Sequence, residues 1–133
     1  MKKLLFLLMF LLPFIGFAQQ LPEKDPSDEN VFIAVEVMPE FPGGTAAMME
    51  YLSKSVKYPS DALEAKITGK VFVSFIINEK GKVTDAKVLR GIGTSCDNEA
   101  IRVVNEMPNW KPGTQSGKAV KVKYTLPIAF KLS

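Results

Sequence analysis

The side chains that most often carry out covalent chemistry in proteins are scarce in this sequence. Its 133 residues include no His and a single Cys, Cys96, which excludes a His-based catalytic triad, a His-based metal site and an internal disulfide. General acid–base catalysis would then depend on Asp, Glu or Lys. The Asp and Glu carboxylates are scattered over expected turns and helix ends. Cys96 lies near the expected start of a helix, where thiolates are favoured. It also begins an apolar helical stripe, so we interpret it as a buried packing residue. We expect no catalytic residue, no cofactor and no metal site, and therefore no enzyme.

Two glycine-containing segments resemble nucleotide-binding loops only in part. Gly91-Ile92-Gly93 follows an expected strand, but Cys96 stands where the third glycine of a dinucleotide loop would be. The segment 113–118 (GTQSGK) has three residues between its glycines instead of the four of a P-loop, and it leads into a strand. Both segments are interpreted as turns.

The first eighteen residues have the pattern of a secretory signal peptide. Lys2 and Lys3 precede an apolar run from Leu4 to Phe17, and Ala18 ends a possible cleavage site. As a helix this run would span about 21 Å, less than the roughly 30 Å of a bilayer core. We expect residues 1–18 to be cleaved and the protein to be periplasmic. The alternative is an uncleaved anchor that holds the domain on the periplasmic side of the inner membrane.

Charge is divided unevenly between the two halves of the remaining chain. Residues 19–64 contain nine acidic and three basic side chains, whereas residues 65–133 contain five acidic and twelve basic ones. Such asymmetry can indicate an anionic partner, but a solvated lysine-rich face is the favoured interpretation. An exported protein is not expected to bind nucleic acid.

The chain is long enough for one domain. Residues 19–34 are expected to form a short polar tail (19–30) and a lead-in strand that begins at Val31, and residues 35–133 the domain itself. Apolar spacing predicts a helix after the turn cluster at 39–44, and Tyr58-Pro59 ends it and opens a second short helix. The run 70–77 (KVFVSFII) predicts a central strand. It is joined by a tight turn at Gly81 to a strand over 82–89, with a bulge near Asp85.

A second amphipathic helix is predicted from Cys96 to Met107, followed by a turn that contains Trp110. The final strand is predicted over 118–131, and Pro127 should lie where that strand is at an edge of the sheet, because Pro lacks a ladder donor. The order of elements predicts an α+β fold, with helices packed on one face of a small, three- to four-stranded antiparallel sheet.

Short non-catalytic motifs occur in a fixed order through most of the chain. They are Tyr58-Pro59, 69–77 (GKVFVSFII), Gly81-Lys82-Val83, Asp97-Asn98-Glu99-Ala100, Trp110-Lys111-Pro112-Gly113, Gly117-Lys118 and Pro127-Ile128-Ala129-Phe130. This ordered set resembles the C-terminal domain of TonB, the energy transducer of bacterial outer-membrane uptake. The resemblance covers about Val35 to Leu132, and MPEFPGG at 38–44 is similar to an extension found in one branch of the family.

The resemblance implies that the domain binds the TonB box, a short extended segment of outer-membrane receptors, by adding a strand to its sheet edge. We expect that edge at the start of the last strand, where Lys121 and Lys123 would discourage aggregation. The expected partner-binding residues are Val56, Lys57, Tyr58, Pro59, Val120, Lys121, Val122, Lys123 and Tyr124. Gly69, Gly81, Trp110, Pro112 and Gly113 are expected to be structural.

Full-length transducers of this family have a retained membrane helix and a long Pro-rich spacer. Here the expected tail has twelve residues (19–30) and reaches about 40 Å at most. We expect a part in energy-coupled transport through TonB-dependent receptors, with motor subunits or a full-length transducer as further partners, and a homodimer through paired edges is possible. The alternative is a free-standing periplasmic interaction module that binds peptides, cell-wall material or itself without direct energy transduction.

Overall fold

The computed structural model describes residues 22–133, so the expected signal peptide at 1–18 lies outside the described residues. Within the described part of the chain, no helix is both long enough and apolar enough to cross a bilayer. The elements are β1 (Glu23–Asp25), β2 (Asp28–Ala34), α2 (Gly44–Ser55), α3 (Ser60–Glu64), β3 (Gly69–Ile77), β4 (Val83–Arg90), α4 (Thr94–Asn105), β5 (Gly113–Gln115), β6 (Lys118–Val120) and β7 (Val122–Phe130).

Five strands form one sheet in the order β1-β2-β7-β3-β4. Its centre is the antiparallel pair of β3 and β7, whose register is continuous from Gly69 opposite Phe130 to Ile77 opposite Val122. β4 pairs antiparallel with β3, as expected, and β5 and β6 form a separate hairpin. The α+β fold class is confirmed. The expected three- to four-stranded antiparallel sheet is extended by β1 and β2, and it is mixed because β2 runs parallel to β7.

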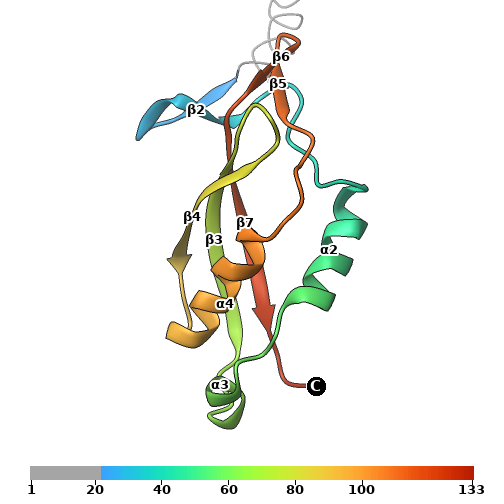
Figure 1. The fold of residues 1–133 in the computed structure, drawn as a ribbon. Coiled ribbons are helices and arrows are strands. Elements are labelled where there is room, and N and C mark those ends of the chain that lie inside the picture. Colours follow the sequence, from blue (N-terminus) through green and yellow to red (C-terminus); the bar gives the residue numbers. More distant parts are fainter. Residues whose placement is uncertain (1–21) are drawn as a thin grey trace, which may run out of the picture.

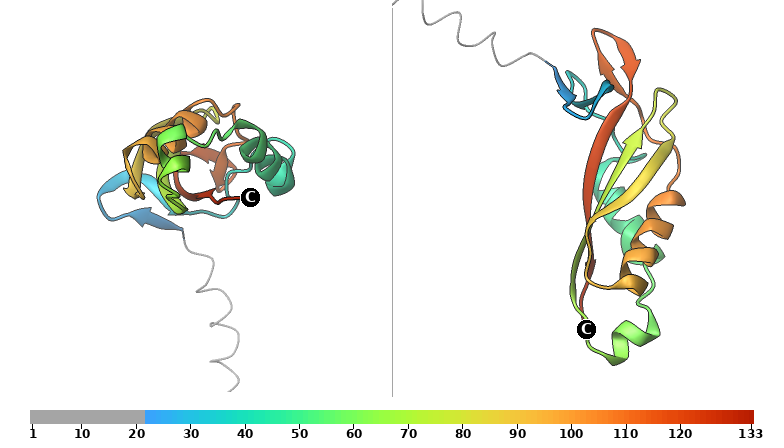
Figure 2. Two further views of the ribbon diagram at one scale, coloured as in Figure 1. Left: turned by 90° about the horizontal axis from the view of Figure 1, so that it is seen from below. Right: turned by 90° about the vertical axis from the view of Figure 1, so that its left-hand side faces the viewer.

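Helices α2 and α4 cover one face of this sheet, with α4 over β3 and β4 and α2 on the side of β7 (Figures 1 and 2). Alternate side chains of β3 and β7 point into this layer because successive residues of a strand face opposite sides. The core consists of Val71, Val73, Phe75 and Ile77 of β3, Leu126, Ile128 and Phe130 of β7, and Cys96, Ala100, Val103 and Val104 of α4, together with Met48, Leu52 and Trp110. Fully burying a side chain of this size contributes about 1.5–3 kcal/mol.

Trp110 is the centre of an aromatic cluster that joins the loop after α4 to the sheet. It is 4% exposed and packs against Phe41, Phe75 and Tyr124 with ring centroids 5.1–5.7 Å apart. The following residues are held to the 37–40 segment, since Lys111 pairs with Glu40 and Thr114 with Val37. Between them lie Pro112 and the buried Gly113, where a Cβ would come within 2.8 Å of Val122.

Gly69 is the first residue of β3.

The strand β4 is bulged as predicted. Asp85 has a positive φ of 54°, and the register with β3 shifts between the pairs Ser74–Lys87 and Ile76–Thr84. The predicted strand over 118–131 is divided at Lys121 into β6 and β7.

The expectation of a polar tail over 19–30 is wrong for its described part. Residues 23–34 form the β1–β2 hairpin, whose turn is closed by the Asp25 carboxylate accepting hydrogen bonds from the amide and the hydroxyl of Ser27. The lead-in strand begins at Asp28, three residues before its expected start, and ends at Ala34. Local polarity favoured a tail here, but pairing with β7 and burial of Val31 give the segment a tertiary partner.

Candidate functional site

The side of β7 that faces away from β3 is an open strand edge over most of its length. The amide of Phe32 donates a hydrogen bond to the carbonyl of Lys121 (2.9 Å), so the Lys121 backbone points to the β2 side. Backbone polar groups alternate between the two sides of a strand, and the β3–β7 register has no irregularity. The backbone groups of Thr125, Pro127 and Ala129 therefore point to the β2 side too, where the described residues supply β7 with only one strand partner, Phe32 opposite Val122.

A groove with a volume of about 360 Å³ lies along this open side of β7. The second half of β7 forms one wall, and the end of α2 with the segment after it forms the other. Figure 1 shows α2 on the side of β7 that faces away from β3. Most of the lining side chains are apolar, and Met49 is 58% exposed. The lining residues are Met49, Leu52, Ser53, Val56, Tyr58 and, on the sheet side, Pro127, Ile128, Ala129, Phe130 and Lys131.

Tyr58 connects the two walls of the groove. Its ring packs edge-on against Phe130 at a centroid distance of 5.6 Å, and its hydroxyl donates a hydrogen bond to the carbonyl of Ile67. Desolvation by burial raises the pKa of Tyr58, so its hydroxyl stays protonated at neutral pH. These two contacts fix the Tyr58 side chain in the groove wall.

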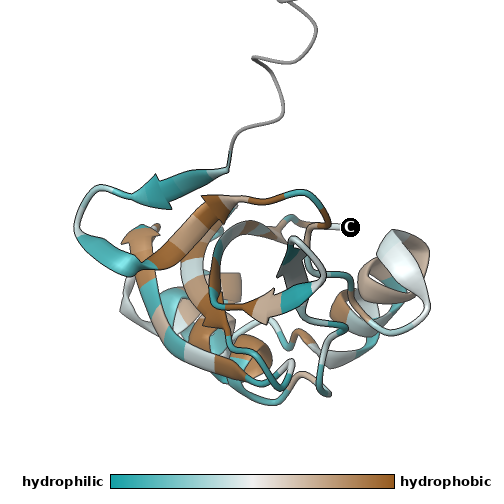
Figure 3. Ribbon diagram, turned by 90° about the horizontal axis from the view of Figure 1, so that it is seen from above, coloured by the Kyte–Doolittle hydropathy of each residue, from teal (hydrophilic) through white to brown (hydrophobic). Residues whose placement is uncertain are grey.

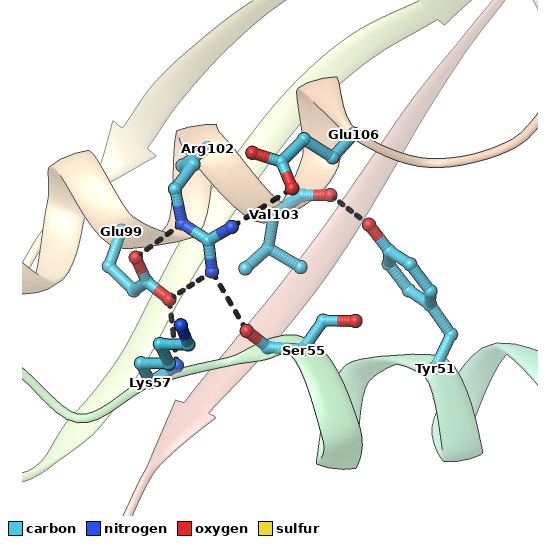
Figure 4. Close-up of polar contacts among 7 residues, drawn as sticks. All are labelled: Tyr51, Ser55, Lys57, Glu99, Arg102, Val103 and Glu106. Atoms are coloured by element: carbon cyan, nitrogen blue, oxygen red, sulfur yellow. Dashed lines mark hydrogen bonds and ion pairs between the residues drawn. The ribbon is translucent and has the colours of Figure 1, made fainter.

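A polar network on α4 holds the segment that follows α2 (Figure 4). Arg102 forms a two-pronged ion pair with Glu99 at 2.8 and 2.6 Å, and its Nη2 also donates to the carbonyl of Ser55 at 2.8 Å. Glu99 accepts a hydrogen bond from the Lys57 amide at 2.7 Å. The Ser55 carbonyl is one of the groups that a helix end leaves without an intrahelical partner, so the network both caps α2 and fixes the groove wall. The hydrogen bonds from Arg102 hold the pKa of Glu99 below its usual range.

The structure brings one half of the predicted site together in the groove. Val56 and Tyr58 line it, and the Lys57 backbone is bound by Glu99 while its side chain is exposed. Pro59 lies just beyond, as the residue that precedes α3.

The prediction that Val120–Tyr124 forms an open edge of the sheet is wrong. Val120 pairs with Gly113 in the β5–β6 hairpin, and Lys121 and Val122 meet β2. Lys123 forms an ion pair with Asp25 at 3.4 Å, and Tyr124 packs against Trp110. The open part of β7 lies further along, at Thr125–Phe130. Pro127 was the sequence signal for it, since within a sheet Pro is found mainly on edge strands, where its missing donor faces away from the paired strand.

The described residues offer little for catalysis or metal binding. Cys96 is 1% exposed, and desolvation by burial raises the pKa of its thiol, which opposes thiolate formation. No group of His, Cys, Asp and Glu side chains within residues 22–133 could hold a metal ion.

Comparisons with known proteins give one family match and similar solved structures. The family model described as Gram-negative bacterial TonB protein C-terminal matches residues 54–132. Two solution structures of the Helicobacter pylori TonB C-terminal domain are similar, at 27% and 26% identity, and each match covers 65% of this chain. The matches cover 78% and 90% of those chains, with TM-scores of 0.49 and 0.46. A search of curated proteins gave no match.

Proposed function

This chain belongs to the family of Gram-negative bacterial TonB C-terminal domains, and from that premise we propose that it binds an extended segment of TonB-dependent outer-membrane receptors. The segment adds as a strand to the open side of β7 in the groove between β7 and the end of α2. An unpaired strand edge offers a row of donors and acceptors that an extended peptide can complete. The domain thereby takes part in energy-coupled transport.

The observation that carries the proposal is the uncharged and regular character of this edge, in which Pro127 is the one residue that withholds a backbone donor. The side chains of β7 from Thr125 to Phe130 are uncharged, and the adjoining groove is mostly apolar. The opposite edge of the sheet, β4, is bulged at Asp85 and presents the exposed charges of Lys87 and Arg90. Bulges and charges are the usual means by which proteins block unwanted strand pairing. Of the open side of β7 and the edge strand β4, the side of β7 carries fewer such features, because a guest strand there lacks only the donor of Pro127.

The proposed site combines Val56, Lys57, Tyr58 and Pro59 with the second half of β7. Polar backbone groups at Thr125 and Ala129 supply donors and acceptors, and Pro127 supplies an acceptor only. Alternate side chains of the guest strand contact Val56, Tyr58 and the exposed Met49. Thioether side chains adapt readily to different apolar partners.

We further propose that residues 1–18 are removed on export and that the domain acts in the periplasm, where the receptor segments are accessible. Motor subunits or a full-length transducer would then supply the energy coupling.

The experiment is a titration of the isotopically labelled protein with a synthetic TonB-box peptide, followed through backbone amide signals. Perturbations should gather on Thr125, Ala129 and the 56–58 segment, and a sequence-scrambled peptide should give much smaller ones. Perturbations confined to β4, or signals that report only self-association at rising protein concentration, would contradict the proposed site. No perturbation with peptides from several receptors would contradict receptor binding itself.

A further inference from the structure

The β1–β2 hairpin occupies one end of the same β7 edge that the proposed function assigns to a partner. Phe32 of β2 lies opposite Val122 in a parallel pairing, and its amide donates to the Lys121 carbonyl at 2.9 Å. Asp25 of β1 forms the ion pair with Lys123 at 3.4 Å. The hairpin thus takes the positions immediately before the open stretch that begins at Thr125.

The hairpin contacts the rest of the sheet through a small apolar region in the middle of β2. Val31 is 2% exposed, whereas the turn and the first residues of β2 are exposed. Figure 3 shows β2 changing from hydrophilic at the turn to hydrophobic at the arrowhead, where it meets the sheet. The attachment is therefore specific in position, but it is carried by few interactions. Residues 23–34 also precede the part of the chain that matches the family model, 54–132.

We propose that the β1–β2 hairpin is a built-in stop that fixes the length and register of the guest strand. This inference rests on the proposed strand addition to β7. Because Phe32 already uses the Lys121 carbonyl, a guest strand pairs only from Thr125 to the end of β7. Receptor segments that are longer toward β2 gain no further backbone hydrogen bonds while the hairpin is in place. Lengthening of the docking edge requires release of Phe32 and of the Asp25–Lys123 ion pair.

The test compares two synthetic TonB-box peptides, one short and one extended at both ends by about four residues, a length that β2 would obstruct. The native protein is compared with the double variant Phe32→Pro/Asp25→Asn, whose side-chain oxygen can still accept the turn hydrogen bonds from Ser27 while the charge that pairs with Lys123 is removed. Proline at position 32 removes the amide that donates to Lys121, and that amide points away from β1, so pairing within the hairpin is retained. Glu29→Ala, an exposed change in the same hairpin, is the matched control.

In the native protein and in Glu29→Ala, both peptides should bind with affinities equal within about twofold, and the Phe32 amide should remain protected from hydrogen exchange. In the double variant the extended peptide should bind more tightly than the short one, by roughly two- to tenfold for each backbone hydrogen bond gained.

Two outcomes would overturn the inference while leaving strand addition intact. The extended peptide could bind more tightly to the native protein and expose the Phe32 amide, or the double variant could show no preference for it. If the double variant does not fold, hydrogen exchange at Phe32 in the native protein decides between the alternatives. If neither peptide protects the amides of Thr125 and Ala129 from hydrogen exchange, the proposed function is contradicted. The inference about the hairpin, which rests on that function, is then contradicted too.

Discussion

The backbone amide of Trp110 donates a hydrogen bond to the carbonyl of Gly81 at 2.7 Å, and a Cβ at position 81 would lie 1.9 Å from the Trp110 carbonyl oxygen. The turn between β3 and β4 is thus pressed against the loop that follows α4. That loop in turn places the Trp110 ring against Tyr124 of β7. A turn residue with no side chain therefore sets the position of the aromatic ring that packs against β7.

Gly81→Ala should lower the free energy of unfolding by more than about 3 kcal/mol, because the methyl group cannot fit without moving the backbone of Trp110. The matched control is Gly117→Ala, where φ is also positive (75°) but nothing lies within 4 Å of the added Cβ. That variant should lose only about 1 kcal/mol, the cost of the left-handed conformation alone. Urea unfolding measures both, and equal losses would show that the close approach is unimportant.

Replacement of Trp110 separates ring packing from hydrogen bonding. The buried indole Nε1 has no hydrogen-bond partner among the described residues, so Trp110→Phe removes no such bond and keeps an aromatic ring. We expect it to cost about 1 kcal/mol. Trp110→Ala should cost about 3–5 kcal/mol through the cavity it leaves. Thermal unfolding followed by circular dichroism compares them, and a Phe variant as unstable as the Ala variant would reveal a polar contact for the indole.

The elements that sequence predicted correctly are those whose signals are local. The apolar run at 70–77 and the turn glycine at position 81 correspond to β3 and its turn, and the stripe that begins at Cys96 corresponds to α4. The β1–β2 hairpin was missed because residues 23–30 are charged and polar, which are weak strand formers. Its strands depend on Val31 and on the bond from Phe32 to Lys121, which join parts of the chain far apart in sequence.

The same distinction separates the two halves of the candidate site. Tyr58-Pro59 separates two helices, and a Pro at the start of a helix is a local sequence signal. The position of this pair beside the groove could therefore be predicted from the sequence. Whether Lys121 lies at an open edge depends on which strand lies beyond it, and alternation along 118–124 is the same for covered and open strands. Pro127 was the more reliable indicator, because a residue without an amide hydrogen is confined to edge strands, strand starts and bulges.

Acidification should weaken the contact between Glu99 and the segment after α2, which forms one wall of the groove. Arg102 lowers the pKa of Glu99 from its ordinary value of about 4.5. The ionised carboxylate therefore stabilises the folded state above that ordinary value, and this contribution is lost as pH falls through the lowered folded-state pKa. Unfolding free energy should decline over this acid range, and exchange of the Lys57 amide should accelerate with it.

Glu99→Gln tests the assignment, because it keeps an acceptor for the Lys57 amide but removes the titrating charge. The variant should lose this part of the acid dependence, and the Lys57 amide should exchange at a rate nearly independent of pH after correction for intrinsic exchange. An unchanged acid profile in the variant would assign the effect to other carboxylates.

Two proline substitutions on neighbouring residues of β7 distinguish the binding edge from the structural one. The Ala129 backbone points to the open side, as that of Pro127 does, so Ala129→Pro removes one outward donor and leaves the β3 pairing intact. Its fold should persist, and its affinity for a TonB-box peptide should fall by roughly two- to tenfold.

The Ile128 backbone points to β3, so Ile128→Pro breaks the central pairing and buries a ring that lacks a donor, and this variant should unfold. Peptide titration and thermal unfolding of the pair provide the measurement. If Ala129→Pro folds and binds as tightly as the native protein, strand addition along this side of β7 is incorrect, because the lost donor would then have had no partner.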